Sequence, residues 1–251
     1  MDSKKTDFPY LYETHLHTTE GSACAHNTAE ELVYAYKEAG YTGIMVTDHF
    51  YRGNCAIDRN MAWEDWVEAY CKGYENAKAA GDKIGLQVFF GWEESHQGTD
   101  FLIYGLDKNW LKQHPELKEV TIEEQYQLVH NAGGMVIHAH PYREAWYIPE
   151  IRLYPESIDG VEVFNASHYG RVPEEDGRSA YDIQAEEYAE KYHLPRTGGS
   201  DIHSTNLLYG GIAFARKLTD VKDYMKAVLA REGQPIDYFK IRREQDALKT
   251  I

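Results

Sequence analysis

The segment "ETHLHTTE" near the N-terminus holds two histidines, His15 and His17, with one leucine between them. Side chains at positions i and i+2 of a strand point to the same face, so both imidazoles should project together. Two neutral imidazoles held side by side form half of a binding site for a transition metal ion. Such a pair can also arise by chance in a chain with 12 histidines. The rest of the sequence therefore has to decide between a metal site and coincidence.

Imidazole and carboxylate residues recur at four further predicted strand ends. They are Asp48 and His49 in "VTDHF", Glu93 and Glu94 in "FFGWEE", His138 and His140 in "VIHAHP", and Asp201 and His203 in "GGSDIH". In a parallel barrel the carboxyl ends of the strands lie on one rim, where active sites are built. Polar residues gathered at the ends of apolar strands are costly unless they are paired or bind metal. The pattern therefore predicts a metal site at this rim.

The donor types indicate which ions such a site would take. Mixed imidazole and carboxylate ligands suit Zn²⁺, Mn²⁺ or Fe rather than Ca²⁺ alone. A catalytic zinc ion takes about three protein ligands and keeps one position open. The sequence offers more donors than that, so we expect a cluster of two or three divalent ions. Clusters of this kind activate a water molecule and clamp the oxygens of a phosphoryl group.

Short apolar runs alternate with helical patterns along the chain. Strands are predicted at 10–17, 41–49, 86–93, 100–106, 135–141, 158–165 and 195–203, and helices at 28–40, 61–81, 121–134, 179–193 and 219–233. The first helix has a capping box formed by Thr28 and Glu31, and the third has another formed by Thr121 and Glu124. A last strand and a solvated tail are expected within 237–250.

Strands that alternate with helices indicate right-handed βαβ units and a parallel sheet. Seven such strands fit an α/β barrel of the TIM-barrel type, formed as a single domain over residues 1–251. A doubly wound open sheet is the alternative. It lacks support because no G-x-G-x-x-G follows the first strand.

Composition limits the partners and the compartment. The formal net charge of −15 would repel long nucleic acid, although it does not exclude a small phosphorylated substrate. No apolar run approaches the length of a membrane span, and the N-terminus has no apolar signal core. The three cysteines form no C-x-x-C pair. We therefore expect a reduced, cytoplasmic protein with no membrane partner, and the oligomeric state stays open.

The motifs occur in an order that resembles the PHP (polymerase and histidinol phosphatase) superfamily. They are "ETHLHT", "AGYTGIMVTDH", "GWE", "HAHPYR", "GVEVFN" and "GSDIH". The resemblance spans roughly residues 10 to 215. It implies a distorted seven-stranded (β/α)7 barrel with a di- or trinuclear metal site. It also implies phosphoester hydrolysis by a metal-bound hydroxide.

The resemblance assigns roles to individual residues. The ligands of a first metal would be His15, His17, Glu93 and Asp201. Glu93 would bridge to a second metal held by His140, and a third metal would be bound by His49 and His203. Asp48 would orient a neighbouring group. Arg143, after "HPY", resembles a phosphate clamp, a role that suits the planar fork of a guanidinium group.

Two places depart from the family pattern. The stretch "TTEGSACAHNT" offers Glu20, Cys24 and His26 as a further ligand of the third metal, with Glu20 favoured and His26 next. The stretch "IYGLDKN" lacks the histidine that many relatives supply after the fourth strand. His138 could replace it as a ligand, or it could be a hydrogen-bonded neighbour of the ligands. His96 and His168 lie near enough to the rim to line a pocket.

The sequence thus predicts a metal-dependent phosphoesterase that acts on a small phosphorylated metabolite or nucleotide. Histidinol phosphate, a nucleoside bisphosphate and the end of a short oligonucleotide are all candidate substrates. The alternatives are an amidohydrolase, a PHP-type 3'-5' exonuclease, and a metal-binding domain without catalytic activity.

Overall fold

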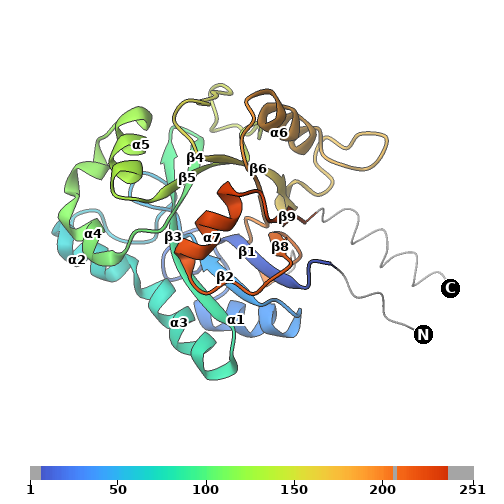
Figure 1. The fold of residues 1–251 in the computed structure, drawn as a ribbon. Helices are drawn as coiled ribbons and strands as arrows, with labels where there is room; N and C mark the ends of the chain where they lie inside the picture. Colours follow the sequence, from blue (N-terminus) through green and yellow to red (C-terminus); the bar gives the residue numbers. More distant parts are fainter. Residues whose placement is uncertain (1–6, 206–207, 237–251) are drawn as a thin grey trace.

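The computed structural model describes residues 7–205 and 208–236, so the strand and tail expected within 237–250 lie outside it. Strands and helices alternate along most of the described chain (Figure 1). The strands are β1 (Tyr10–Leu16), β2 (Gly43–Val46), β3 (Gln87–His96), β4 (Thr99–Tyr104), β5 (Met135–Ala139), β6 (Gly160–Asn165), β7 (Arg196–Gly199), β8 (Ile212–Phe214) and β9 (Gln234–Pro235). The helices are α1 (Ala29–Glu38), α2 (Trp63–Tyr70), α3 (Lys72–Ile84), α4 (Lys108–Gln113), α5 (Ile122–Asn131), α6 (Ala180–Lys191) and α7 (Val221–Leu229).

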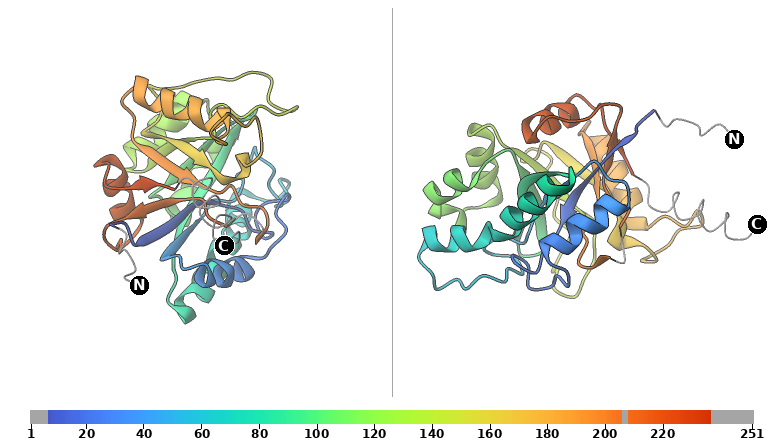
Figure 2. Two further views of the ribbon diagram at one scale, coloured as in Figure 1. Left: turned by 90° about the vertical axis from the view of Figure 1, so that its right-hand side faces the viewer. Right: turned by 90° about the horizontal axis from the view of Figure 1, so that it is seen from below.

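The strands form one strongly curved sheet in the order β7-β6-β5-β4-β3-β2-β1-β8-β9. Just beyond β7, Ile202 makes a parallel bridge to Leu16 in β1, so the two sides of the sheet meet (Figure 2). The sheet is therefore a nearly closed barrel, which confirms the predicted barrel and excludes the doubly wound alternative. Strands β8 and β9 were not among the seven predicted strands, and they extend the sheet beside β1.

The direction of β4 differs from the sequence prediction. β4 runs antiparallel to both of its neighbours, β3 and β5. It follows β3 through a two-residue turn, Gln97 and Gly98, and both turn residues have positive φ angles, of 53° and 83°. Tight turns with positive φ angles are typical of β-hairpins. As a result, the beginning of β4, and not its end, lies beside the end of β3.

The helix boundaries follow local sequence signals in most cases. Both predicted capping boxes are present, one at the start of α1 and the other at the start of α5. The helix predicted over 61–81 is two helices, α2 and α3, which meet at Cys71. Helix α4 was not predicted, and its N-cap is Asp107, whose side chain accepts a hydrogen bond from the Trp110 backbone N–H.

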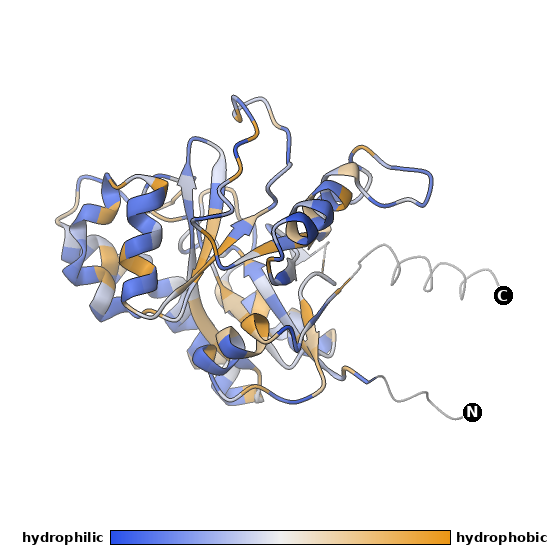
Figure 3. Ribbon diagram, turned by 45° about the horizontal axis from the view of Figure 1, so that its top comes forward, coloured by the Kyte–Doolittle hydropathy of each residue, from blue (hydrophilic) through white to orange (hydrophobic). Residues whose placement is uncertain are grey.

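The two faces of the barrel sheet carry different hydrophobic clusters. The inner face packs against α7 through residues such as Tyr12, Met45 and Leu102. The outer face packs against the other helices, with Trp66 and Phe101 in the cluster beside α2 and α6. Figure 3 shows hydrophobic residues on the strands and hydrophilic residues on the exposed helix surfaces. Within the described residues, no helix combines the length and apolar character needed to cross a bilayer.

Candidate metal centre

His15 and His17 project together into the barrel mouth. The strand register shifts between Glu13 and Leu16, which breaks the regular alternation that begins at Tyr12. Leu16 packs into the cluster between the sheet and α1, while the two imidazole rings lie 5.1 Å apart. Both histidines are fully buried. Alternation keeps the two rings on one face, and the local irregularity of β1 turns that face into the barrel mouth.

Five histidines and three carboxylates form four overlapping groups in this space. Within each group, the candidate ligand atoms all lie within 4.8 Å of one another. The groups are His15, His17 and Glu93; His15, His140 and Asp201; Glu93, Asp100 and His140; and His17, His49 and His203. The groups share members, so the donors form one continuous cluster and not several separate sites.

Glu93 lies at the middle of the cluster. Its Oε1 atom is 3.2 Å from His15 Nε2 and 3.2 Å from His140 Nε2. Its Oε2 atom is 2.5 Å from His49 Nδ1 and 3.6 Å from His17 Nε2. One carboxylate thus faces histidines from β1 and from the ends of β2 and β5. This is the geometry that a bridging ligand needs.

Asp201 closes the opposite side of the cluster. Its Oδ1 atom is 3.1 Å from His17 Nε2 and 3.5 Å from His15 Nε2. Both Asp201 and His140 have backbone conformations in the left-handed region, with φ angles of 52° and 30°. Non-glycine residues adopt such angles rarely, and strain of this kind is found mostly at functional sites.

The group of His17, His49 and His203 has Cys24 as a further neighbour. Burial raises the pKa of the Cys24 thiol, but hydrogen bonds with His203 and His49 outweigh this effect and lower the pKa to about 6. The other two candidates from the same stretch lie elsewhere. Glu20 accepts hydrogen bonds from the Ala29 backbone N–H at the start of α1, and His26 is exposed. The structure thus brings Cys24 to this group, in place of the two residues that the sequence favoured.

Asp100 is a member of the cluster that the sequence analysis missed. It is the second residue of β4, and its Oδ2 atom is 3.9 Å from His140 Nε2. It occupies the place for which His138 was considered. The ring of His138 instead stacks on Phe101, on the outer face of the sheet, and His138 belongs to none of the four groups. Burial lowers the pKa of His138 to about 3, so this imidazole is neutral.

Two buried carboxylates hold the first pair of histidines in place. Glu162 in β6, also missed in the sequence, lies with Oε1 3.0 Å from His15 Nδ1. Asp48 accepts a hydrogen bond from the Ser22 hydroxyl, which in turn lies 3.1 Å from His17 Nδ1. Burial raises the pKa of Asp48 to about 6, although the hydrogen bonds from Ser22 and Thr18 act to lower it. Each histidine thus presents Nε2 to the cluster while its Nδ1 faces a fixed partner.

Arg143 borders the cluster and is largely buried. Its Nη2 atom lies 2.6 Å from Asp201 Oδ2 and also donates a hydrogen bond to the Ser167 hydroxyl. Its Nε donates to His168 Nε2, and His168 Nδ1 lies 2.6 Å from Asp182. Within the described residues, Nη1 of Arg143 has no hydrogen-bond partner. The guanidinium group is therefore held rigidly with one nitrogen left for a ligand.

The charges and the unpaired atoms of the cluster fit bound cations. Burial opposes charge on His15, but the carboxylates of Glu162, Asp201 and Glu93 outweigh it and raise its pKa well above the usual value. Within the described residues, His15 Nε2, Glu93 Oε2 and Asp100 Oδ1 are buried and lack a well-formed hydrogen bond. Buried polar atoms without partners are rare unless an ion or a ligand satisfies them. The nitrogen and oxygen donors suit Zn²⁺, Mn²⁺ or Fe.

Glu94 and His96 point away from this cluster, as strand alternation requires. Glu94 accepts a hydrogen bond from Arg52 Nε at 3.1 Å, and burial raises its pKa to about 7. His96 Nε2 lies 2.8 Å from Gln125 Oε1 and 2.9 Å from Arg52 Nη2. Both residues therefore belong to the layer between β3 and α5 and not to the barrel mouth.

No protein-family model and no curated protein sequence matches the chain. Solved structures do match. A two-domain protein from Bacteroides vulgatus contains a predicted PHP-like metal-dependent phosphoesterase; it matches with a TM-score of 0.65 and 14% identity over 94% of this chain and 69% of that chain. A protein from Bifidobacterium adolescentis assigned to the metal-dependent phosphoesterases matches with a TM-score of 0.55 and 16% identity over 88% of this chain and 96% of that chain. PsfC from Pseudomonas syringae matches with a TM-score of 0.58 and 15% identity over 86% of this chain and 87% of that chain.

The chain has the PHP fold. This agrees with the resemblance carried by the sequence motifs, although at these identities the likeness concerns the fold alone. Solved structures of proteins named for other chemistry also match this chain. An amidohydrolase from Chromobacterium violaceum matches with a TM-score of 0.50, 14% identity, and coverage of 77% of this chain and 87% of that chain. Endonuclease Q matches with a TM-score of 0.53, 11% identity, and coverage of 88% of this chain and 56% of that chain.

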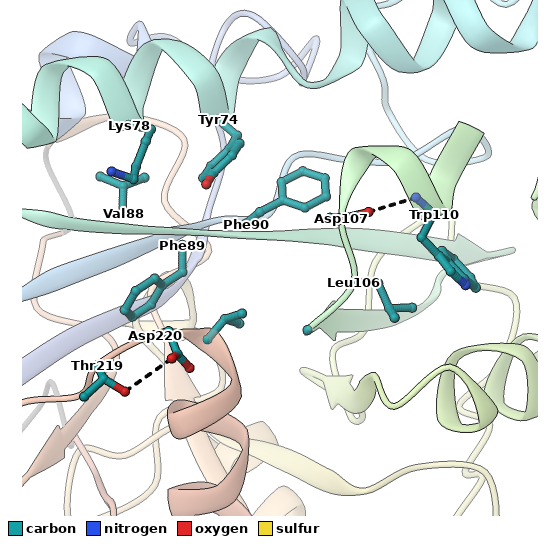
Figure 4. A pocket seen from close by; sticks show the side chains of 12 residues that line it. Tyr74, Lys78, Val88, Phe89, Phe90, Leu106, Asp107, Trp110, Thr219 and Asp220 are labelled. Carbon is teal, nitrogen blue, oxygen red and sulfur yellow. Dashed lines mark hydrogen bonds between the residues drawn. The ribbon is translucent and has the colours of Figure 1, made fainter. Parts of the chain in front are cut away.

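A separate pocket of about 630 Å³ lies at the other end of the PHP barrel (Figure 4). It is lined by aromatic residues from β3 and the surrounding helices, among them Tyr74, Phe89, Phe90 and Trp110. None of its lining residues is a histidine, a cysteine or a glutamate. Its chemistry therefore differs from that of the metal centre.

Proposed function

We propose that this chain is a metal-dependent phosphoesterase that hydrolyses a small phosphorylated metabolite or nucleotide. The observation that carries the proposal is the continuous cluster of imidazoles and carboxylates around Glu93, with Arg143 fixed at its edge. The fold, shared with PHP-like proteins, supports the same conclusion.

The geometry favours a particular division of the ligands. His15, His17, Glu93 and Asp201 would hold a first ion, and Glu93, Asp100 and His140 a second. His49, His203 and Cys24 would hold a third, with His17 beside it. When bound, such ions lower the pKa of a coordinated water and neutralise charge on the phosphate oxygens.

The chain's own residues would prepare the centre for this reaction. Glu162 keeps a proton on His15 Nδ1, so the Nε2 lone pair faces the cluster. Asp48 acts through Ser22 on His17 in a similar way. Arg143 can donate a hydrogen bond from Nη1 to a phosphate oxygen, while its contacts with Asp201 and His168 fix the orientation of the guanidinium group. Asp48 and Glu162 are therefore positioning residues, and Arg143 would touch the substrate.

A screen of substrates on samples of known metal content tests the proposal. Phosphate release from a panel of phosphomonoesters should require Mn²⁺, Zn²⁺ or Fe²⁺ and should stop after chelation. Parallel panels of amides and of short oligonucleotides test the amidohydrolase and exonuclease alternatives. Asp201→Asn serves as the matched inactive control. Full activity in a sample shown to be free of metal would refute the proposal, and turnover of amides alone would favour the amidohydrolase.

A further inference from the structure

The loop between β5 and β6 passes directly beside the metal centre, and it projects from the molecule in Figure 1. It is anchored at both ends. Near its start, the Arg143 backbone N–H donates to the His140 carbonyl at 3.0 Å. Near its end, Arg152 Nε donates to the Thr99 hydroxyl at 3.1 Å, and Nη2 donates to the His96 carbonyl. Residues 144–151 are therefore held between the centre and the β3–β4 turn.

The middle of this loop forms a tight turn. The Ile148 backbone N–H donates to the Ala145 carbonyl at 2.9 Å, so residues 145–148 make the turn. Ile148 packs so closely on Gly98 that a Cβ atom there would lie 2.8 Å from its side chain. A small pocket is lined by Ile148 of this loop together with Asp100, His140 and Arg143 of the centre. Trp146 and Tyr147 are the two residues at the tip of this turn.

Trp146 and Tyr147 are unusually exposed for aromatic residues. Trp146 is 96% exposed and Tyr147 51% exposed, and their rings meet edge to face at 5.7 Å. The other four tryptophans of the chain are buried or partly buried. The tip of the loop thus presents two apolar rings to solvent at the edge of the proposed active site.

Tyr147 is the inner ring of the pair. Burial raises the pKa of its hydroxyl, which also lies in the electrostatic field of Arg143, Asp100 and Asp201. Within the described residues, this hydroxyl has no hydrogen-bond partner. Tyr147 thus lies within electrostatic range of the centre, and Trp146, the more exposed ring, packs edge to face against it.

We infer that Trp146 and Tyr147 bind a planar aromatic ring in the leaving group, so the substrates are phosphomonoesters of the nucleotide type. The inference rests on the proposed function and names its substrate class. A nucleobase that stacks on tryptophan gains affinity through its flat face, and this gain does not depend on which hydrogen-bonding groups the edge of the base carries. Arg143 would hold the phosphate, the Tyr147 hydroxyl would lie near the sugar, and Trp146 would stack on the base. The acidic surface does not oppose such a small ligand as it would a long polyanion.

Adenosine 5'-monophosphate and ribose 5-phosphate form a matched pair for the test, because they differ only in the base. Wild type should show kcat/KM at least tenfold higher for the nucleotide. Trp146→Ala should lower kcat/KM for the nucleotide about tenfold and leave that for the sugar phosphate unchanged, while Trp146→Phe keeps most of the preference. Tyr34→Ala, which removes a 46% exposed aromatic residue from α1, is the control and should change neither value.

A binding measurement separates this inference from the proposed function. The phosphonate analogues of the two ligands, with a methylene group in place of the ester oxygen, cannot be hydrolysed, so calorimetry reports affinity without turnover. Trp146→Ala should weaken the nucleotide analogue about tenfold and leave the other unchanged. If no phosphate ester is hydrolysed, the proposed function fails and the calorimetry still decides the inference. Equal affinities of wild type and Trp146→Ala for the nucleotide analogue would overturn the inference.

Discussion

Glu93 and Glu94 are neighbours in sequence with opposite surroundings. Glu93 faces four imidazoles in the barrel mouth, whereas Glu94 lies on the other face of β3 against Arg52. The two residues have the same chemistry and both are buried. Their different roles therefore follow from strand alternation alone.

Glu93→Gln should remove nearly all phosphatase activity and most of the bound metal, because a neutral amide is a poor bridge between cations. Glu94→Gln should retain metal and most activity. Metal analysis together with kcat/KM for a phosphomonoester compares the two variants. Greater loss in Glu94→Gln would contradict the assignment of the two faces of β3.

Cys24 makes the third group chemically distinct, since thiolate is a softer ligand than imidazole or carboxylate. Protein loaded with Co²⁺ should show a near-ultraviolet charge-transfer band from sulfur to metal, and Cys24→Ser should lose it. Cys71→Ala is the control, because Cys71 is buried in the hydrophobic cluster beside α2. A band that survives in Cys24→Ser would exclude Cys24 as a ligand.

His96 should make folding stability depend on pH. Burial lowers its pKa to about 4, so between pH 4 and 6.5 the unfolded chain binds more protons at this site than the folded chain. Stability should therefore rise with pH across this window. The contribution of His96 to the free energy of unfolding should be ~2 kcal/mol lower at pH 5 than at pH 7.5.

Chemical unfolding of the chelated protein at both pH values tests the effect of His96. His96→Gln should show a smaller loss of stability between pH 7.5 and pH 5 than wild type. The exposed His26 provides the control variant, His26→Gln, which should behave like wild type. An unchanged pH dependence in His96→Gln would show that His96 is not held neutral.

At the scale of elements, the hairpin of β3 and β4 shapes the second ion site. Because β4 runs back along β3, its second residue, Asp100, reaches the mouth, and its far end carries Asp107 to the opposite end of the barrel. A parallel β4 would have brought the other end of the strand to the mouth. The antiparallel strand thus supplies a carboxylate where the family resemblance led us to look for a histidine.

Asp100→Asn should therefore reduce the amount of bound metal while the first site, built from His15, His17, Glu93 and Asp201, stays filled. Asp107→Asn is a matched control at the other end of the strand. It should keep the helix cap, because asparagine caps a helix about as well as aspartate, and it should leave metal content unchanged. Equal metal loss in the two variants would argue against a ligand role for Asp100.

The sequence predicted the elements better than their directions. Capping boxes and apolar periodicity located α1 and α5, and polar residues after apolar runs located the strand ends at the mouth. The antiparallel β4 was missed although a signal existed. Only six residues separate the strands predicted at 86–93 and 100–106, whereas a parallel crossover needs a dozen or more.

Loop contacts had no comparable sequence signal. Glu20, Cys24 and His26 lie within a few residues of each other, and only the path of the loop decides which of them reaches His49 and His203. Likewise, Glu162 looks in sequence like any polar residue of a strand. Its role depends on β6 lying close enough to β1 for its carboxylate to meet His15.

At the scale of the whole molecule, the centre concentrates ionisable groups inside the barrel. Three carboxylates and five imidazoles are costly to bury together unless cations balance them. Ion binding should therefore stabilise the whole fold, because these ligands come from β1, β3, β4 and from segments that follow β2, β5 and β7. The metal would tie together segments from nearly the entire described chain.

Addition of Zn²⁺ or Mn²⁺ to the chelated protein should raise Tm by roughly 5–10 °C at concentrations about a hundred times Kd. Asp201→Asn should show a smaller shift, since one ligand of the first site is altered. Differential scanning calorimetry on samples of measured metal content gives both values. Identical Tm values with and without metal would show that the cluster does not bind ions tightly.

The left-handed backbones of His140 and Asp201 have a consequence for evolution. Each costs free energy that glycine would not, of order 1 kcal/mol or more, and only a useful side chain repays it. In a lineage that no longer needs catalysis, glycine at either position would relax the backbone and remove a buried ionisable group in one step. Selection for stability alone would thus erode the centre at these two positions first. Retention of histidine and aspartate there, across descendants of this chain, would mark continuing selection for activity.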